Sequence, residues 1–137
     1  MILGIDPGRR RVGVAAADEV TRFARPVEVI DTRARDPVAR IADLVVQLQA
    51  TAVVVGLPVA LSGTEGPAAS EQREFMSRLR EALAIDVIPY DERLTTVVAE
   101  RALRDAGTKS HKLKGLRDAV AAQVLLQDYL DATSASL

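Results

Sequence analysis

The chain has 137 residues and a net charge of −1, which arises from 18 basic and 19 acidic residues. This length predicts a single domain over residues 1–137 that can bury a core without cross-links. Because the chain has no cysteine and only one histidine, the sequence excludes disulfides, cysteine nucleophiles and zinc sites made of thiolates or histidine clusters. Any bound metal is therefore expected to have oxygen ligands.

The amino terminus enters a strand pattern at once, without the basic region and apolar stretch of a signal peptide. No apolar run approaches the roughly 20 residues that are needed to cross a bilayer. We therefore expect a cytoplasmic protein that has no membrane partner.

Three strands are predicted at the start of the chain, at 1–6, 11–17 and about 26–30. Pro7 and Gly8 separate the first two strands, and this connection is too short for a crossover helix. The two strands should therefore pair as an antiparallel hairpin.

Strands and helices then alternate. We expect a helix at 36–49, a buried strand at 51–56, a loop at 57–67, a helix at 68–83, a strand at 86–90, a helix at about 95–107, a basic linker at 108–114, a last helix at 115–131 and a frayed tail at 132–137. This order predicts an α/β fold with a mixed five-stranded sheet, three antiparallel strands followed by parallel strands, flanked by helices. Right-handed crossovers would place the first and fourth strands side by side.

Three carboxylates occupy positions that suit a metal site: Asp6 ends the first strand, Glu92 follows the fifth, and Asp118 opens the last helix. A carboxylate directed at a core must be paired, protonated or bound to a cation, because desolvating it alone is too costly. Successive acids at a strand end point to opposite sides, so Glu92 is favoured over Asp91 as the partner of Asp6. The alternatives are a simple turn at Asp6 and helix-end electrostatics at the other two acids.

Three acids around one point repel one another by about 3 kcal/mol per pair at a separation of about 5 Å and an effective dielectric of about 20. Divalent cations would relieve this repulsion. Mg²⁺ or Mn²⁺ held by oxygen ligands suits phosphodiester hydrolysis, because such ions activate water and stabilise a leaving oxygen. The three acids therefore predict a metal-dependent phosphodiesterase.

Basic residues gather in two segments despite the nearly neutral total. Arg9, Arg10 and Arg11 form the first cluster, and the second lies between positions 101 and 117, where Asp105 is the one acid. The basic residues of this second segment are Arg101, Arg104, Lys109, Lys112, Lys114 and Arg117. Such segregation can create a phosphate-binding surface, although a solvated helix face is an alternative.

Further candidate substrate contacts are Arg93 and, in the 57–67 loop, Ser62 and Thr64. The chain has only two phenylalanines and two tyrosines, too few for a platform on which successive bases stack. Recognition of the phosphate backbone or of nucleic-acid shape is therefore expected.

Four motifs in order resemble the YqgF (RuvX) family over nearly the whole chain. They are Gly4-Ile5-Asp6-Pro7-Gly8 with Arg11-Val12-Gly13-Val14-Ala15; Val55-Gly56-Leu57-Pro58 with Gly63-Thr64-Glu65-Gly66; Asp91-Glu92-Arg93-Leu94-Thr95-Thr96 with Ala99-Glu100; and Asp118 with Ala121-Ala122 and Leu125-Leu126-Gln127. The resemblance implies an RNase H-like fold and a nuclease that processes the 5′ end of pre-16S rRNA in ribosome biogenesis. Pro7 looks more like the residue found in RuvC resolvases, which makes branched DNA the second candidate substrate.

Two other functional classes remain open. The pattern Gly4-Ile5-Asp6 followed by Gly8 also resembles the first phosphate motif of actin-like and sugar-kinase ATPases, but their nucleotide lies between two such domains and this chain has room for one. A non-catalytic nucleic-acid-binding domain is the other alternative. The sequence leaves open whether the protein is a monomer or a homodimer.

Overall fold

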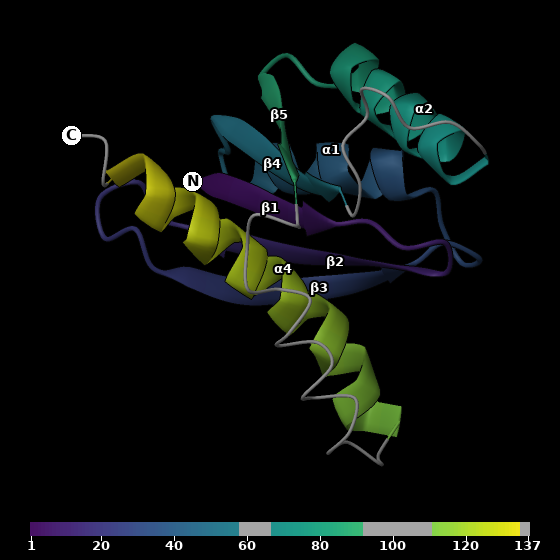
Figure 1. Cartoon of the computed structure of the whole chain (residues 1–137), viewed down its shortest axis with the longest axis horizontal. Coiled ribbons are helices and arrows are strands. Elements are labelled where there is room, and N and C mark those ends of the chain that lie inside the picture. The colour runs from purple at the N-terminus through teal and green to yellow at the C-terminus, as the bar shows by residue number, and fades with distance from the viewer. Residues whose placement is uncertain (58–66, 92–110, 135–137) are drawn as a thin grey trace.

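The computed structural model describes residues 1–57, 67–91 and 111–134; within these ranges, the side chains of 67–69, 111–118 and 134 are not described. The described chain forms one sheet with helices on both faces (Figure 1). Its elements are β1 (Ile2–Asp6), β2 (Arg11–Ala17), β3 (Ala24–Asp31), α1 (Pro37–Gln47), β4 (Ala52–Leu57), α2 (Pro67–Ala82), β5 (Asp86–Asp91) and α4 (His111–Ser134).

The five strands lie in the order β3-β2-β1-β4-β5. The β1–β2 and β2–β3 pairs are antiparallel, whereas β1–β4 and β4–β5 are parallel. The predicted hairpin and the predicted neighbours β1 and β4 are therefore confirmed. Since Ile5 pairs with Val55 and Gly56 pairs with Tyr90, the carboxyl ends of β1, β4 and β5 meet at one edge of the sheet.

Helices α1 and α2 cover one face of the sheet, which we call the aliphatic face (Figure 1). Asp36 caps α1 by accepting a hydrogen bond from the Val38 N–H at 3.3 Å, and Pro37 occupies the first turn, as the sequence predicted. The core on this face is built from large side chains. It includes Leu3, Ile5, Val53, Val55, Ile41, Leu44, Met76 and Leu79, all buried. Burial of this apolar area is the main stabilising contribution to the fold.

Helix α4 covers the opposite face, which we call the α4 face. Ala122, Leu126 and Leu130, spaced four residues apart, pack there against Ala15, Ala17 and Val54. The approach is close at Gly4, where an added Cβ would lie 2.7 Å from the Leu126 Cβ. The small residues of this face therefore determine how near α4 comes to β1.

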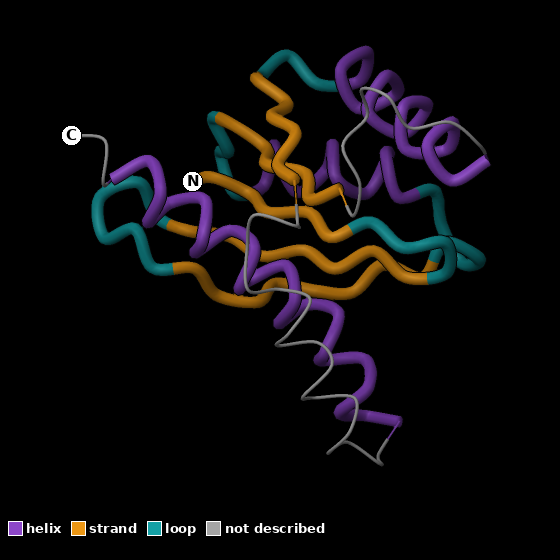
Figure 2. The backbone as a smooth tube through the Cα atoms, in the orientation of Figure 1, coloured by secondary structure: helices purple, strands orange, loops and turns teal. Residues whose placement is uncertain are grey.

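Two glutamines fix the carboxyl-terminal half of α4 to the end of the sheet opposite Asp6. Gln127 accepts a hydrogen bond from the Ala24 N–H at 2.9 Å and donates one to the Arg22 carbonyl at 3.0 Å, while Gln123 donates to the Ala24 carbonyl at 3.0 Å. The amino-terminal half of α4 therefore lies toward the edge at which β1 ends. Figure 2 shows the helix crossing the sheet diagonally and extending past β3.

The boundaries of the last helix were predicted wrongly. The helix begins at His111 rather than near position 115, so residues 111–114 are helical and not a linker, and it continues to Ser134. Lysine and leucine favour a helix, and the interior Gly115 costs only about 1 kcal/mol, so it does not stop the helix. Asp118 is consequently the eighth residue of α4 and does not lie in its first turn. The helix predicted at 95–107 lies outside the described residues.

Candidate active site

Asp6 is the buried charged side chain of the described part of the chain, with 9% of its surface exposed. It ends β1 at the carboxyl edge of the sheet, just before the turn that leads into β2. That turn needs glycine at position 8, because an added Cβ would lie 2.5 Å from the Arg11 carbonyl oxygen. The local sequence therefore presents the Asp6 carboxylate at a fixed point in a largely desolvated environment.

Asp6 faces α4. Its side chain lies on the same face as that of Ile2, because side chains two residues apart on a strand share a face, and Ile2 packs into the α4-side core. Gly56 and Tyr90 are the laterally adjacent positions on β4 and β5. The Tyr90 ring meets Tyr129 of α4 edge to face, with centroids 5.6 Å apart. Burial, followed by the negative charge of Asp128, raises the pKa of Tyr90, so its phenol is a neutral wall of this region at pH 7.

Asp91, the second choice for a metal ligand, lies on the other face. It pairs with Leu57, whose side chain belongs to the aliphatic core, and directly opposed residues share a face. This placement agrees with the alternation that favoured its neighbour in the sequence. That neighbour, Glu92, lies outside the described residues.

Asp118 is placed by its helix. Position 118 is one turn before Ala122, in the row of positions that continues through Leu126 and Leu130 and packs on the sheet. Moving from Ala122 to position 118 leads toward the sheet edge at which β1 ends. The side chain of Asp118 is not among those described.

A metal site built from all three predicted acids stays a prediction. Among the described side chains, no group of three acidic or histidine residues is close enough to hold a metal ion. Two of the three predicted ligands, Glu92 and Asp118, are not in that set of side chains. The available donors on this chain are oxygen atoms, and a buried carboxylate at a strand end fits a hard cation.

The first basic cluster lies beside Asp6 in the β1–β2 turn. Arg9 forms an ion pair with Glu71 of α2 at 3.3 Å, with 77% and 56% of the two side chains exposed. Arg10 is exposed and Arg11 is half-buried, and neither has an acidic partner among the described residues. Arg10 and Arg11 therefore fit a phosphate-binding role better than Arg9, whose charge is partly neutralised.

Several predicted substrate contacts cannot be placed as side chains. Ser62, Thr64, Arg93 and Lys109 lie outside the described residues, whereas Lys112 and Lys114 belong to the first turns of α4. The second basic segment is thus partly helical, and its remaining positions stay predictions.

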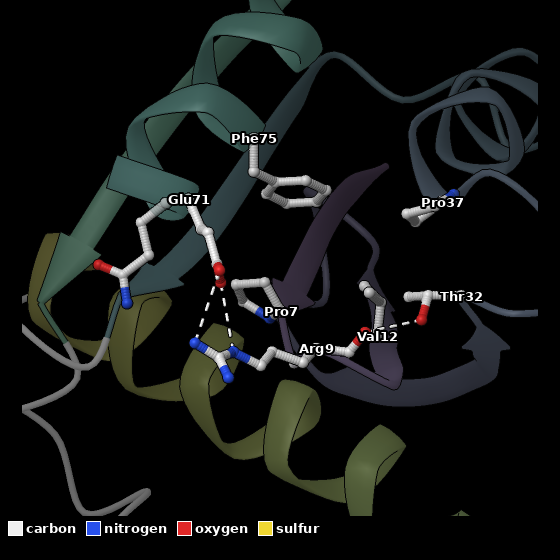
Figure 3. Close-up of a pocket in the computed structure, with 9 residues that line it drawn as sticks. Pro7, Arg9, Val12, Thr32, Pro37, Glu71 and Phe75 are labelled. Carbon is white, nitrogen blue, oxygen red and sulfur yellow. Dashed lines mark hydrogen bonds and ion pairs between the residues drawn. The ribbon is translucent and has the colours of Figure 1, made fainter. Parts of the chain in front are cut away.

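The sequence did not predict a pocket of about 250 Å³ that lies beside the β1–β2 turn (Figure 3). It is lined by Pro7, Gly8, Arg9, Val12, Thr32, Pro37, Glu71, Gln72 and Phe75. The aromatic residue of this lining, Phe75, comes from α2. The spacing of Glu71, Gln72 and Phe75 on one helix was a usable signal, but only the fold places that helix beside the turn.

The structural neighbours show the fold. Thermus thermophilus RuvC in complex with a Holliday junction superposes with a TM-score of 0.60 at 18% identity, covering 97% of this chain and 94% of RuvC. The Fowlpox virus resolvase in complex with Holliday junction DNA gives a TM-score of 0.56 at 11% identity, covering 96% and 97% of the two chains. The chain therefore has the RNase H-like fold that its motifs implied. No helix within the described ranges is long and apolar enough to span a membrane.

Relatives found by sequence comparison have higher sequence identity to this chain than these two structures have. A protein of Chloroflexus aggregans named "Putative pre-16S rRNA nuclease" is 45% identical over 132 residues, covering 96% of this chain and 93% of that protein. A protein of Anaeromyxobacter dehalogenans with the same name is 44% identical over 130 residues, covering 94% and 95%. A model of the RuvX family, described as Holliday junction resolvase, matches residues 1–132. On these matches, which span nearly its whole length, the chain belongs to the RuvX family.

Proposed function

We propose that this protein is a divalent-metal-dependent endonuclease that hydrolyses phosphodiester bonds in structured nucleic acid. The observation that carries the proposal is the buried Asp6 carboxylate at the carboxyl edge of the sheet, where β4 and β5 also end. Open α/β sheets have their ligand-binding and active sites at this edge.

Asp6, Glu92 and Asp118 would hold Mg²⁺ or Mn²⁺, and all three offer the oxygen ligands that these ions prefer. A bound ion of this kind supplies an activated water and stabilises the leaving oxygen in phosphodiester hydrolysis. The protein's own contribution is to fix the carboxylates and exclude bulk water. Burial of Asp6 strengthens its interactions with a cation, because the local dielectric is low.

Pre-16S rRNA is our first candidate substrate and branched DNA the second. Relatives that are 44–45% identical over nearly the full chain carry the rRNA nuclease name. The description of the RuvX family and the titles of the RuvC and Fowlpox complexes instead name Holliday junctions, but those two structures are only 18% and 11% identical to this chain. Sequence similarity therefore favours RNA.

A cleavage assay tests the proposed activity. Purified protein is given a precursor rRNA fragment and a four-way DNA junction, each with Mg²⁺, with Mn²⁺ and with chelator. We expect metal-dependent cleavage of the RNA. Metal-dependent cleavage of the junction alone would support nuclease activity and overturn the substrate order, whereas binding of both without cleavage would favour the non-catalytic alternative.

Asp6→Asn tests the role of the buried acid. We expect cleavage to fall by at least about 100-fold, because a metal ligand is lost, while the fold is kept. Thermal unfolding without metal should occur at an equal or higher temperature, because repulsion among the acids is relieved. The control is Asp43→Asn, which makes the same change at an exposed position of α1 and should leave both measurements unchanged. Wild-type turnover by Asp6→Asn would show that Asp6 is structural.

Replacing Lys109, Lys112 and Lys114 by alanine tests the second basic segment. If all three side chains contact phosphates, the log–log dependence of affinity on salt should flatten by up to about one unit per lost contact. Binding should weaken similarly for different sequences, because phosphate contacts carry no base information. An unchanged slope in titrations at several salt concentrations would leave the arginine turn as the main phosphate contact.

A further inference from the structure

The pocket beside the β1–β2 turn lies near Asp6 but on the other side of the sheet. Pro7 and Gly8, which line it, follow Asp6 directly in the sequence, whereas Phe75 and Glu71 come from α2. Consecutive Cα atoms are about 3.8 Å apart, so one wall of the pocket begins within one or two residues of the proposed catalytic carboxylate. A nucleic-acid strand that passes over this edge of the sheet from a phosphate at Asp6 would bring a neighbouring nucleotide to the pocket.

The walls of the pocket are partly apolar and include one aromatic ring. Figure 3 shows the Phe75 side chain projecting from α2 into the space above Pro7 and Val12. The ring is only partly buried and lies at the margin of the aliphatic core. An aromatic face of this kind is suited to stack on a planar base, because every base has a π-face.

The polar groups of the pocket lie around that apolar centre. The Gln72 Oε1 atom is buried and accepts no hydrogen bond from any residue that the structure describes. Arg9 and Glu71 form an ion pair on one side of the pocket (Figure 3). Because the Gln72 Oε1 atom is buried, it is not accessible to a ligand in the pocket.

The floor of the pocket is held in place. The Thr32 hydroxyl lies 2.7 Å from the Arg9 carbonyl oxygen, and the Thr32 N–H donates to the Arg10 carbonyl at 2.9 Å. These bonds tie the end of β3 to the turn that carries Pro7 and Arg9. The pocket is thus largely formed before any ligand binds, which lowers the ordering cost of binding.

We propose that this pocket binds the base of an unpaired nucleotide near the scissile phosphate, with Phe75 stacking on the base. The inference rests on the proposed nuclease function. It differs from a base-stacking platform, for which the sequence has too few aromatics, because it needs only one ring. Arg10, exposed in the adjoining turn, is our candidate contact for a phosphate of the same strand.

Titration with mononucleotides, followed by NMR of the wild-type protein, tests the pocket without requiring cleavage. The probes are adenosine 5′-monophosphate and ribose 5-phosphate, which lacks the base. We expect adenosine monophosphate to shift the Val12 methyl and Phe75 ring signals saturably, and ribose 5-phosphate to leave these signals unmoved. Equal shifts with ribose 5-phosphate, or no saturable shift at these residues, would overturn the proposal.

Variants assign the contacts. Phe75→Leu keeps an apolar side chain but removes the ring, and should weaken binding of adenosine monophosphate by about 5- to 100-fold, the range expected for losing one base–aromatic stacking contact. Phe75→Tyr keeps the ring and should restore binding, which separates stacking from core packing. Phe23→Leu is the matched control, because Phe23 is 76% exposed and precedes β3 at the other end of the sheet.

The proposed base-binding pocket and the proposed nuclease activity can be tested separately. Metal-dependent cleavage by a protein that shows no base-dependent binding would overturn the pocket and keep the nuclease. Base-dependent binding at Phe75 by a protein that cleaves neither RNA nor DNA would overturn the nuclease, and with it the placement of the bound base next to a scissile phosphate.

Discussion

Leu3 and Gly4 are neighbours on β1, yet the two faces of the sheet make opposite demands on them. Leu3 points to the aliphatic face and is fully buried among large side chains. Gly4 points to α4 and has no room even for a methyl group. The aliphatic face is thus stabilised by the packing of large side chains. On the α4 face, the absence of a side chain at Gly4 allows α4 to lie close to the strand that carries Asp6. The aliphatic face supports the fold and the α4 face positions the candidate site.

Leu3→Ala should have the largest effect on stability. Removing a fully buried leucine side chain leaves a cavity, so the free energy of unfolding should fall by about 2–5 kcal/mol. Urea unfolding measures this change. Because the cavity lies on the aliphatic face, the cleavage rate of the folded fraction should stay close to that of the wild type. A large loss of turnover in fully folded protein would contradict the division between the two faces.

Gly4→Ala should have a smaller effect on stability and a larger effect on activity. The new Cβ would lie 2.7 Å from the Leu126 Cβ, and overpacking of this kind costs about 1–3 kcal/mol. If Asp118 is a metal ligand, displacement of α4 would also disturb the proposed site, so turnover should fall in protein that is still folded. Combining Gly4→Ala with Leu126→Ala should cost less free energy than the sum of the single changes, because the clash is relieved. If the free-energy costs of the two changes are additive, the side chain of Leu126 does not restrict the size of the residue at position 4.

Glu28→Gln should have the smallest effect, and the effect should depend on pH. Arg40 of α1 binds Glu28 of β3 at 2.7 Å, with 22% and 26% of the two side chains exposed. This hydrogen bond lowers the pKa of Glu28 below its ordinary value of 4.5, against an opposing contribution from burial. A lowered pKa in the folded state means that the pair stabilises the fold above about pH 4.5 and loses this contribution as the pH falls through the folded-state pKa.

At pH 7 the Glu28→Gln variant should therefore be less stable than the wild type by up to about 1 kcal/mol, and the difference should shrink on acidification. Chemical unfolding at several pH values between 7 and 3 measures the trend. Glu74→Gln, at an exposed position of α2, provides the control and should show little difference at any pH. A difference that stays constant with pH would mean that the charge of Glu28 is not the stabilising feature.

The sequence alone determined the five strands, the neighbours of β1 in the sheet and the special position of Asp6. Alternating and continuous apolar runs, the Asp36-Pro37 helix start and the short turn at Pro7 and Gly8 are local signals, because they depend on residues only a few positions apart. The handedness of crossovers then leaves few ways to arrange the strands. The motifs around Asp6 also indicated the family to which the chain belongs.

Only the tertiary structure decided what lies against these elements. The contact between Gly4 and Leu126 and the ion pair between Arg9 and Glu71 join residues far apart in the chain, and no local pattern specifies such distances. The same holds for the pocket at Phe75, which exists because α2 lies beside the β1–β2 turn. The early start of α4, before Gly115, was not predicted from the sequence. The free energy that one interior glycine costs is smaller than the stabilisation from the neighbouring helix-forming residues and from packing of the whole helix. Local sequence specifies elements, whereas close packing between distant segments specifies which side chains meet.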